Sequence, residues 1–406
     1  MLIKKLQEKM NVLERSDLLR HKWIAQSQTG TQQMLLSATQ LNPSEQTLFC
    51  SNDYLGFANH PDILYALKEG VDHWGGGSGA SHLISGHMRP HEELEVMLSQ
   101  LFLRLIPDNR CLTFSTGYMA NLAVMTVLGD ASSEIFSDEL NHASLIDGIR
   151  LSKGKVNIYK HRDYDALDNL LSNSTADTRL IVTDGVFSMD GDRANVDVLQ
   201  KLAHKHDAWI VVDDAHGYGV IGDEGLGSLE SEQLICDRVI LVGTLGKSAG
   251  LSGAFIVAHQ TIIEYIFQTA RSYIYTTAPL PAISYALLKS LDLMHGDVGR
   301  QRRGHLRVLE HHLRCGLSDL LGKYPAAGLS ISDSVSPIQA VIVGQSQRAT
   351  DLSDGLNDLG FRVPGIRPPT VPIGTSRIRV TLSADHSIDD VDRLMNAFRI
   401  LFNKII

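Results

Sequence analysis

The chain has 406 residues, of which 43% are hydrophobic and 20% are charged. Its 37 lysines and arginines against 46 aspartates and glutamates give a formal net charge of −9. A chain of this length and composition can bury a large core, so the sequence predicts a globular protein of two or three domains and excludes disorder for most of it. An acidic balance without a long basic run argues against a nucleic-acid partner.

The cysteines and the first residues indicate the compartment. The four cysteines lie far apart, and no CxxC pair or Cys/His group has the spacing of a zinc site, so we expect reduced thiols and no metal. Charged residues interrupt the first 25 positions, which argues against a signal peptide. No run reaches the about 20 apolar residues of a membrane span. We therefore expect a cytoplasmic protein without a membrane partner.

The predicted elements begin with a helix and continue as an alternation of strands and helices. Leu2, Leu6, Met10 and Leu13 recur at helical spacing, which predicts an amphipathic helix that docks on the body of the protein. From about residue 110 to 245, short β-branched runs alternate with amphipathic stretches, which predicts a mainly parallel sheet between helices. The predicted strands are 111–115, 134–138, 156–160, 180–184, 209–213 and 238–243, and the predicted helices include 118–128 and 196–206.

The pattern changes after Pro279 and Pro281, where a long helical region (residues 282–322) precedes a mixed tail. We place a domain boundary near residue 290. The predicted organisation is a helical N-terminal segment that packs with the small domain, a large domain, and a C-terminal small domain. These parts cover residues 1–50, 51–290 and 291–406.

Polar residues follow most of the predicted strands. Because parallel strands point the same way, residues just past their carboxyl ends meet at one edge of the sheet, where such folds bind ligands. This edge offers a lysine, a carboxylate, an imidazole and a cradle of the size of a phosphate. The segments concerned are Ser115–Tyr118, Asp138–His142, Asp184–Ser188, Asp213–His216 and Gly243–Lys247.

Lys247 and Asp213 have both chemical and ordinary interpretations. Lys247 stands among small residues in GTLGKSAG and is either a Schiff-base lysine or an exposed surface lysine. A P-loop is disfavoured because Leu241 occupies the position of its first glycine. Asp213 ends an apolar strand, so its carboxylate needs a partner, which is a protonated pyridine nitrogen, a helix cap or a metal.

The remaining candidates at this edge are weaker when taken singly. His216 is suited to contact a phenolic oxygen of a ring, or it is a core histidine. His142 is suited to stack on a ring, or it is merely exposed in a loop. Gly117 and Tyr118 precede a helix, whose first N–H groups bind phosphate. The cluster Gly75–Gly79 permits either close approach of a ligand or a flexible turn.

Seven blocks in the same order resemble the α-oxoamine synthases, which are fold-type I pyridoxal phosphate (PLP) enzymes that join an amino acid to an acyl-CoA with loss of CO₂. The resemblance implies the α/β fold of a PLP-dependent transferase, with a large domain whose mainly parallel sheet lies between helices and a smaller α/β domain. It also implies pyridoxal 5′-phosphate as cofactor. The blocks are SNDYLG (51–56), GSGAS (77–81), GYMAN (117–121), NHASLIDG (141–148), TDGVFSMDGD (183–192), VDDAHGYGVIG (212–222) and GTLGKSAG (243–250).

Two later segments indicate a position within the family. Residues 366–386 and 273–281 are similar to the biotin-pathway members, which condense L-alanine with a pimeloyl thioester carried by CoA or a carrier protein. Glycine acetyltransferases share TDGVFSMDG and GTLGK and remain the alternative. The feature that favours the biotin-pathway members is Arg367-Pro368-Pro369, which can also be a stiff connector.

Carried over residue by residue, the resemblance assigns three catalytic residues. Lys247 holds the cofactor as a Schiff base, Asp213 pairs with its ring nitrogen, and His142 stacks on the ring and polarises the thioester carbonyl. Thr276 or Thr277 reaches the phosphate of a neighbouring subunit, which implies a homodimer with shared active sites. Further cofactor contacts are Gly117, Tyr118, Ser188, His216 and Thr244, and the substrate contacts are Asn52 and Arg379 for the amino-acid carboxylate and Arg20 and Arg367 for the far carboxylate of the acyl chain and the substrate entrance.

Overall fold

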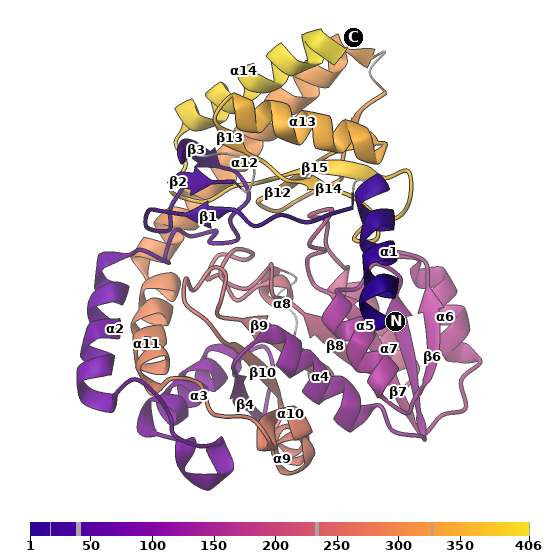
Figure 1. Cartoon of the computed structure of the whole chain (residues 1–406). Helices are drawn as coiled ribbons and strands as arrows, with labels where there is room; N and C mark the ends of the chain where they lie inside the picture. Colours follow the sequence, from indigo (N-terminus) through magenta and orange to yellow (C-terminus); the bar gives the residue numbers. More distant parts are fainter. Residues whose placement is uncertain (17, 38–41, 232–234, 326–327, 406) are drawn as a thin grey trace. The chain divides into compact units, whose positions relative to one another are not determined.

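The computed structural model describes residues 1–16, 18–37, 42–231, 235–325 and 328–405, and the chain divides into two compact units (Figure 1). Unit 1 contains Met1–Tyr54, Met189–Gly191 and Gly304–Ile406, and unit 2 contains Leu55–Ser188 and Asp192–Arg303. The chain passes from unit 2 to unit 1 after Arg303 and not near residue 290, because helix α11 (Pro281–His295) packs against α2 (Pro61–Trp74) and α3 (Arg89–Phe102) inside unit 2.

Unit 2 is built on a sheet of seven strands in the order β4-β10-β9-β8-β7-β5-β6. From β9 to β6 the neighbouring strands are parallel, whereas β10 is antiparallel to both of its neighbours. The predicted mainly parallel sheet between helices is confirmed. The strands are β4 (Asn109–Phe114), β5 (Ser133–Asp138), β6 (Lys155–Tyr159), β7 (Thr178–Asp184), β8 (Trp209–Asp213), β9 (Val239–Thr244) and β10 (Ala254–His259).

Strand β10 was not among the predicted strands. The segment between β9 and β10 is too short for the crossover of a dozen or more residues that a parallel neighbour requires. The chain therefore returns in the antiparallel direction, with Ala254 opposite Thr244 on one side and opposite Phe114 on the other.

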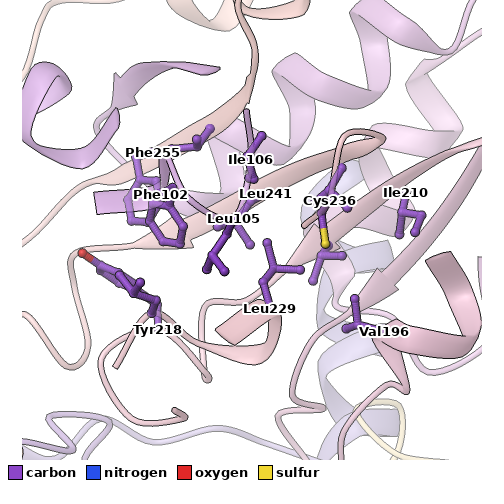
Figure 2. Close-up of a cluster of buried hydrophobic side chains, with 14 of the residues drawn as sticks. Phe102, Leu105, Ile106, Val196, Ile210, Tyr218, Leu229, Cys236, Leu241 and Phe255 are labelled. Atoms are coloured by element: carbon purple, nitrogen blue, oxygen red, sulfur yellow. The ribbon is translucent and has the colours of Figure 1, made fainter. Parts of the chain in front are cut away.

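Both faces of this sheet are buried. Alternate residues of β8 belong to the hydrophobic clusters on opposite faces of the sheet. Ile210 and Val212 belong to the cluster that includes residues of α3, α6 (Tyr164–Ser172), α7 (Val196–Lys205) and α11. Val211 packs with α4 (Gly117–Leu128), α5 (Ala143–Leu151) and α9 (Gln260–Thr269). Figure 2 shows part of the first cluster, around Phe102, Leu241 and Phe255. Burial on both faces explains why the strands are apolar runs rather than alternating patterns.

Three short helical segments complete unit 2. The π-helical turn η1 (His82–Gly86) precedes α3, and α10 (Arg271–Ile274) follows α9. Helix α8 (Ser228–Ser231) lies between β8 and β9 in the sequence. The predicted helical region over 282–322 is formed by α11 and by α12 (Asp297–Lys323), which continues into unit 1.

Unit 1 combines the two ends of the chain in two four-stranded sheets. Strand β3 pairs in parallel with β13, so that Thr47 lies opposite Phe361. One sheet has the order β1-β2-β3-β13 and the other β11-β12-β15-β14. The elements are α1 (Leu2–Arg15), β1 (Ile24–Ala25), β2 (Gln32–Leu36), β3 (Ser44–Leu48), β11 (Ser330–Ile331), β12 (Ile338–Gly344), α13 (Ser346–Asp358), β13 (Phe361–Arg362), β14 (Gly365–Ile366), β15 (Ser376–Thr381) and α14 (Ile388–Ile405).

Two expectations for residues 1–50 need correction. The helix forms as α1, but none of its residues is buried, contrary to the prediction that it docks on the body of the protein. A helical period shows which side chains share a face and does not show what covers that face. The rest of this segment is not helical where the structure describes it, because β1, β2 and β3 lie there. None of the helices in the described ranges is both long enough and apolar enough to span a bilayer.

Candidate functional site

The carboxyl ends of the strands in unit 2 bring several of the predicted residues together. Asp213 ends β8 and lies opposite Asp184, which ends β7. His142 begins the helix that follows β5, and Lys247 follows the end of β9. These four residues therefore lie at one edge of the sheet, as the sequence predicts for the ends of parallel strands.

Asp213 is a buried carboxylate whose hydrogen-bond donors are neutral. Its Oδ2 accepts a hydrogen bond from Asn121 Nδ2 at 2.6 Å, and its Oδ1 accepts one from the backbone N–H of Ala215 at 3.1 Å. The Nδ2 of Asn121 also donates to Ser144 Oγ at 2.8 Å. Its Oδ1 is buried and has no partner in the part of the chain that the structure describes. The site thus holds a buried carboxylate beside an amide oxygen that has no partner among the described residues.

His142 is held as a neutral imidazole. It caps α5, where its Nδ1 accepts a hydrogen bond from the backbone N–H of Ser144 at 3.3 Å. Desolvation lowers the pKa of His142, the charge of Asp213 raises it, and the charge of Lys247 lowers it further. Because Nδ1 is an acceptor, the ring proton of the neutral form lies on Nε2.

Asp184 fixes the backbone of His142. Its Oδ1 accepts a hydrogen bond from the His142 N–H at 3.2 Å, and its own N–H donates to Asn141 Oδ1 at 3.0 Å. Burial raises the pKa of the Asp184 carboxyl well above its usual range, and the neighbouring Asp213 raises it further.

Asn121, Ser144 and Asp184 had no predicted role. Each was nevertheless visible as a signal, because Asn121 and Ser144 stand inside the GYMAN and NHASLIDG blocks and Asp184 stands at a strand end. Their importance follows from their contacts with Asp213 and His142, which only the folded chain shows.

Lys247 is half-buried in the turn after β9. Its charge acts on His142 and on Asp184, so its amine lies near both. Thr244 fixes this turn, because its Oγ1 accepts from the Gly246 N–H at 3.3 Å and donates to the Gly253 carbonyl at 3.1 Å. The two other predicted contacts follow strand ends as well, with His216 buried after β8 and Ser188 half-buried after β7.

The amino terminus of α4 is open. Thr116 caps this helix by accepting a hydrogen bond from the Met119 N–H at 3.3 Å. A Cβ atom added to Gly117 would meet nothing within 4 Å, and Tyr118 is 43% exposed, with its hydroxyl bonded to Asp147. A helix start with open space before it is a site for an anion. Thr276, which is half-buried, and Thr277, which is exposed, follow α10.

These residues fit pyridoxal phosphate. The free lone pairs of the Asp213 carboxylate match a protonated ring nitrogen, and that cation would compensate the buried charge. Open space at Gly117 matches a phosphate at the start of α4. The amine of Lys247 lies near the same edge. Lys247, Asp213, His142, His216 and Ser188 would hold the ring, and Gly117, Tyr118 and Thr244 the phosphate.

A second group of predicted residues lies in unit 1 around Arg379, which is 5% exposed on β15. Its Nη1 donates to Thr381 Oγ1 at 2.9 Å, and its Nη2 lies 3.4 Å from Asn52 Oδ1. The hydroxyl of Tyr54 donates to the same Asn52 oxygen at 3.3 Å. Burial raises the pKa of Tyr54 to about 12, so this hydroxyl stays neutral. The structure brings Asn52 and Arg379 together as predicted.

Unit 1 also contains a cavity of about 900 Å³ that Arg20 and Arg367 both line. Nη1 of Arg367 donates to Thr350 Oγ1 at 3.0 Å. A third arginine, Arg362, lines the cavity with its guanidinium 4.4 Å from the centre of the Trp23 ring. Sequence analysis did not single out Arg362 or Trp23, because their stacking joins two distant segments.

Acidic side chains line the same cavity and balance part of this positive charge. They are Glu14, Asp354 and Asp358.

The chain is similar to known proteins over most of its length. The model of the aminotransferase class I and II family matches residues 44–398. The chain is 50% identical to 8-amino-7-oxononanoate synthase of Leptothrix cholodnii, over 98% of both chains. It is 54% identical to the enzyme of the same name from Cupriavidus taiwanensis, over 86% of both chains.

Solved structures show the same fold. Serine palmitoyltransferase of Sphingomonas wittichii has a TM-score of 0.88 at 28% identity and covers 99% of this chain and 97% of its own. The serine palmitoyltransferase of S. paucimobilis, in a complex that contains PLP, has a TM-score of 0.88 at 26% identity, with the same coverage. An 8-amino-7-oxononanoate synthase from Francisella tularensis has a TM-score of 0.73 at 30% identity and covers 88% of this chain and 97% of its own.

Proposed function

Because the chain belongs to the 8-amino-7-oxononanoate synthase family of PLP-dependent acyltransferases, we propose that it condenses L-alanine with a pimeloyl thioester in biotin biosynthesis. The products are 8-amino-7-oxononanoate, CO₂ and the free thiol of CoA or of a carrier protein. The main support is the 50% identity that extends over 98% of both chains. The cavity with Arg20 and Arg367 adds a site of suitable chemistry for the far carboxylate of a pimeloyl chain.

The cofactor supplies one element of the chemistry. When bound, PLP withdraws electrons from the amino-acid Cα and so stabilises the negative charge that forms there. Asp213, whose carboxylate is buried, would accept a hydrogen bond from the ring nitrogen and so keep the proton on that atom. Asn121 and the backbone of Ala215 keep the carboxylate in place. Lys247 holds the cofactor covalently.

Lys247 and His142 move and position protons. The Lys247 amine would accept the proton from Cα of alanine. His142 stacks on the ring and donates its Nε2–H to the thioester carbonyl, which makes that carbon a better electrophile. The Ser144 N–H on Nδ1 supports this assignment, because it keeps the donor proton on Nε2.

Arginines bind the two carboxylates of the substrates. Arg379 and Asn52 bind the carboxylate of alanine, which suits a forked guanidinium. Arg20 and Arg367 bind the far carboxylate of the acyl chain. The new C–C bond joins Cα of alanine to the thioester carbonyl carbon, the thiol leaves, and the carboxylate of alanine is lost as CO₂.

The remaining contacts complete the cofactor site. Ser188 and His216 face the phenolic oxygen of PLP, and Gly117, Tyr118 and Thr244 bind its phosphate. Thr276 or Thr277 contacts the phosphate bound by a second copy of the chain. The functional form is therefore a homodimer.

A spectral titration tests the choice of amino acid. The holoenzyme is titrated with L-alanine, glycine and L-serine while the absorbance of the bound cofactor is recorded. We expect alanine to change the spectrum at the lowest concentration. A response to glycine alone would favour a glycine acetyltransferase, and a response to serine alone would favour the chemistry that the names of the structural neighbours indicate.

A further inference from the structure

A cluster of histidine and glutamate side chains in unit 2 is not used by the proposed reaction. One ligand atom each of His87, Glu92 and Glu95 lie within 4.8 Å of one another. His87 follows η1, and its Nε2 is 3.1 Å from Glu92 Oε2. Glu92 and Glu95 are three residues apart on α3 and therefore lie on the same face of this helix. The cluster joins the segment before α3 to the first turns of the helix.

Hydrogen bonds from outside the cluster orient two of these side chains. Glu95 Oε1 accepts hydrogen bonds from the N–H and the Oγ1 of Thr113, at 2.8 and 2.7 Å. Because both bonds use Oε1, the other carboxylate oxygen can bind a ligand. Nδ1 of His87 lies 2.8 Å from Nδ1 of His82. His87 therefore presents Nε2 to the two glutamates.

His82 is itself rigidly placed. It is 6% exposed, and its ring stacks on Tyr273 with 4.7 Å between the centroids and 10° between the planes. Its Nδ1 accepts the Nδ1–H of His87 when His87 binds a cation through Nε2. Metal-binding histidines characteristically donate their second ring N–H in this way, and metal-binding carboxylates are likewise hydrogen-bonded from behind. Both supports are present here.

The charge of the cluster also calls for a cation. Two carboxylates lie beside a histidine, and burial desolvates that of Glu95. The nearby arginine on the same helix, Arg89, is paired with Glu93 at 2.7 Å. A buried carboxylate next to a second one is unfavourable unless a positive charge compensates it.

We propose that His87 Nε2, Glu92 and Glu95 bind one divalent transition-metal ion, with Zn²⁺ as the best match. One imidazole nitrogen and two carboxylate oxygens are ligands that Zn²⁺ accepts, with a water molecule in the fourth position. At metal–ligand distances of about 2.0–2.2 Å, tetrahedral ligand atoms are roughly 3.4 Å apart. The present spacing requires only small side-chain adjustments.

The metal would have a structural role. The carbonyl oxygen of Pro279 accepts a hydrogen bond from Ser78 Oγ. The same oxygen lies 2.9 Å from His91 Nε2. The Ala278 N–H donates to the Ala80 carbonyl at 3.0 Å. An ion that joins His87 to α3 would therefore brace the glycine-rich segment 75–79 and the segment that follows Thr276 and Thr277.

Zinc binding by the holoenzyme tests the proposal. PLP-loaded protein is treated with a chelator, dialysed, and titrated with ZnCl₂ in a calorimeter, with parallel titrations of MgCl₂ and CaCl₂. All samples carry Cys315→Ser, because Cys315 Sγ and His311 Nε2 lie 3.6 Å apart and offer a competing soft site. We expect about one Zn²⁺ per chain and much weaker binding of Mg²⁺ and Ca²⁺.

Variants identify the ligands. Glu92→Gln changes an exposed side chain and Glu95→Gln keeps an acceptor for Thr113, so both are expected to fold. Each should weaken Zn²⁺ binding by about 100-fold, and Thr113→Val by about tenfold. Glu93→Gln, on the same helix but paired with Arg89, should bind as the parent does. The proposal would be overturned if the parent bound no zinc, or if Glu92→Gln and Glu95→Gln bound zinc as tightly as the parent.

Discussion

At the scale of single residues, Asp213 is the group on which the cofactor chemistry depends most. Its carboxylate is buried and receives hydrogen bonds from an amide side chain and a backbone N–H. Asp213→Asn keeps the shape but cannot keep the ring nitrogen protonated. We expect kcat to fall by about 100-fold or more, since one preorganised electrostatic partner is worth that much. Steady-state kinetics and the cofactor absorbance measure this effect.

Asp165→Asn is the control for Asp213→Asn, because Asp165 is exposed in the first turn of α6. It should leave kcat unchanged. A wild-type kcat for Asp213→Asn would show that another group protonates the ring.

Arg20 tests the assignment of the cavity in unit 1. Removal of a charged hydrogen bond costs about 1.5–3 kcal/mol, so Arg20→Ala should raise KM for the pimeloyl thioester by roughly 10- to 100-fold. KM for alanine should not change, because its carboxylate is assigned to Arg379. The control is Lys22→Ala, an exposed cation nearby in the sequence. An equal rise of both KM values would contradict a role specific to the acyl chain.

Asp214 predicts a pH dependence of stability. Its carboxyl is fully buried, it is bonded to the N–H and Oγ of Ser228, and burial raises its pKa from 3.8 to about 7. Between these pH values the folded chain binds more protons than the unfolded chain, so stability should fall as the pH rises from 4 to 7. Asp214→Asn should flatten this dependence in melting curves. An unchanged slope would show that Asp214 is ionised in the folded state.

The sequence predicted which site residues lie at the same edge of the sheet, because it predicted where the strands end. Asp213, His142 and Lys247 each follow a strand that the sequence identifies, and the structure brings them to one edge. The contacts of Asn121 and Asp184 were not predictable, because they depend on the order of the strands. Asp184 lies opposite Asp213 only because β7 and β8 are neighbours.

At the scale of elements, the packing of α2 on α11 is set by Gly70. A Cβ atom at this position would lie 2.9 Å from the Ala282 carbonyl oxygen and 3.0 Å from its Cα. Overpacking costs about 1–3 kcal/mol, which exceeds the about 1 kcal/mol that alanine gains over glycine in a helix. Gly70→Ala should therefore lower the melting temperature.

Gly304→Ala is the matched control, since a Cβ atom on this glycine of α12 would meet nothing within 4 Å. Here the gain in helix propensity should raise the melting temperature slightly. A stabilised Gly70→Ala variant would show that α2 and α11 can separate without cost.

Strands that are marked by an apolar run in their own sequence were predicted well. Short strands that form by pairing with segments far away in the sequence were not predicted. The six predicted strands of unit 2 all form, because their apolar runs are separated by helices. Strands β1 to β3 were missed. They are short, and β3 is completed by β13, which lies more than 300 residues away in the sequence.

At the scale of the whole molecule, the net charge of −9 contrasts with the anionic ligands of the proposed reaction. The chain places its positive charge locally, with Arg379 buried on β15 and Arg20, Arg362 and Arg367 around one cavity. These arginines all belong to unit 1, whereas the residues assigned to the cofactor belong to unit 2. The net charge of the whole sequence does not show that the arginines assigned to the substrates are gathered in unit 1.

The most direct test is the identity of the product formed by the purified holoenzyme. L-alanine, glycine and L-serine are each combined with pimeloyl, acetyl, succinyl and palmitoyl thioesters, and free thiol and product mass are recorded. We predict that alanine with the pimeloyl thioester is the fastest pair and gives 8-amino-7-oxononanoate with one CO₂ per thiol released. Fastest turnover with glycine and the acetyl thioester, or with serine and the palmitoyl thioester, would contradict the proposed function.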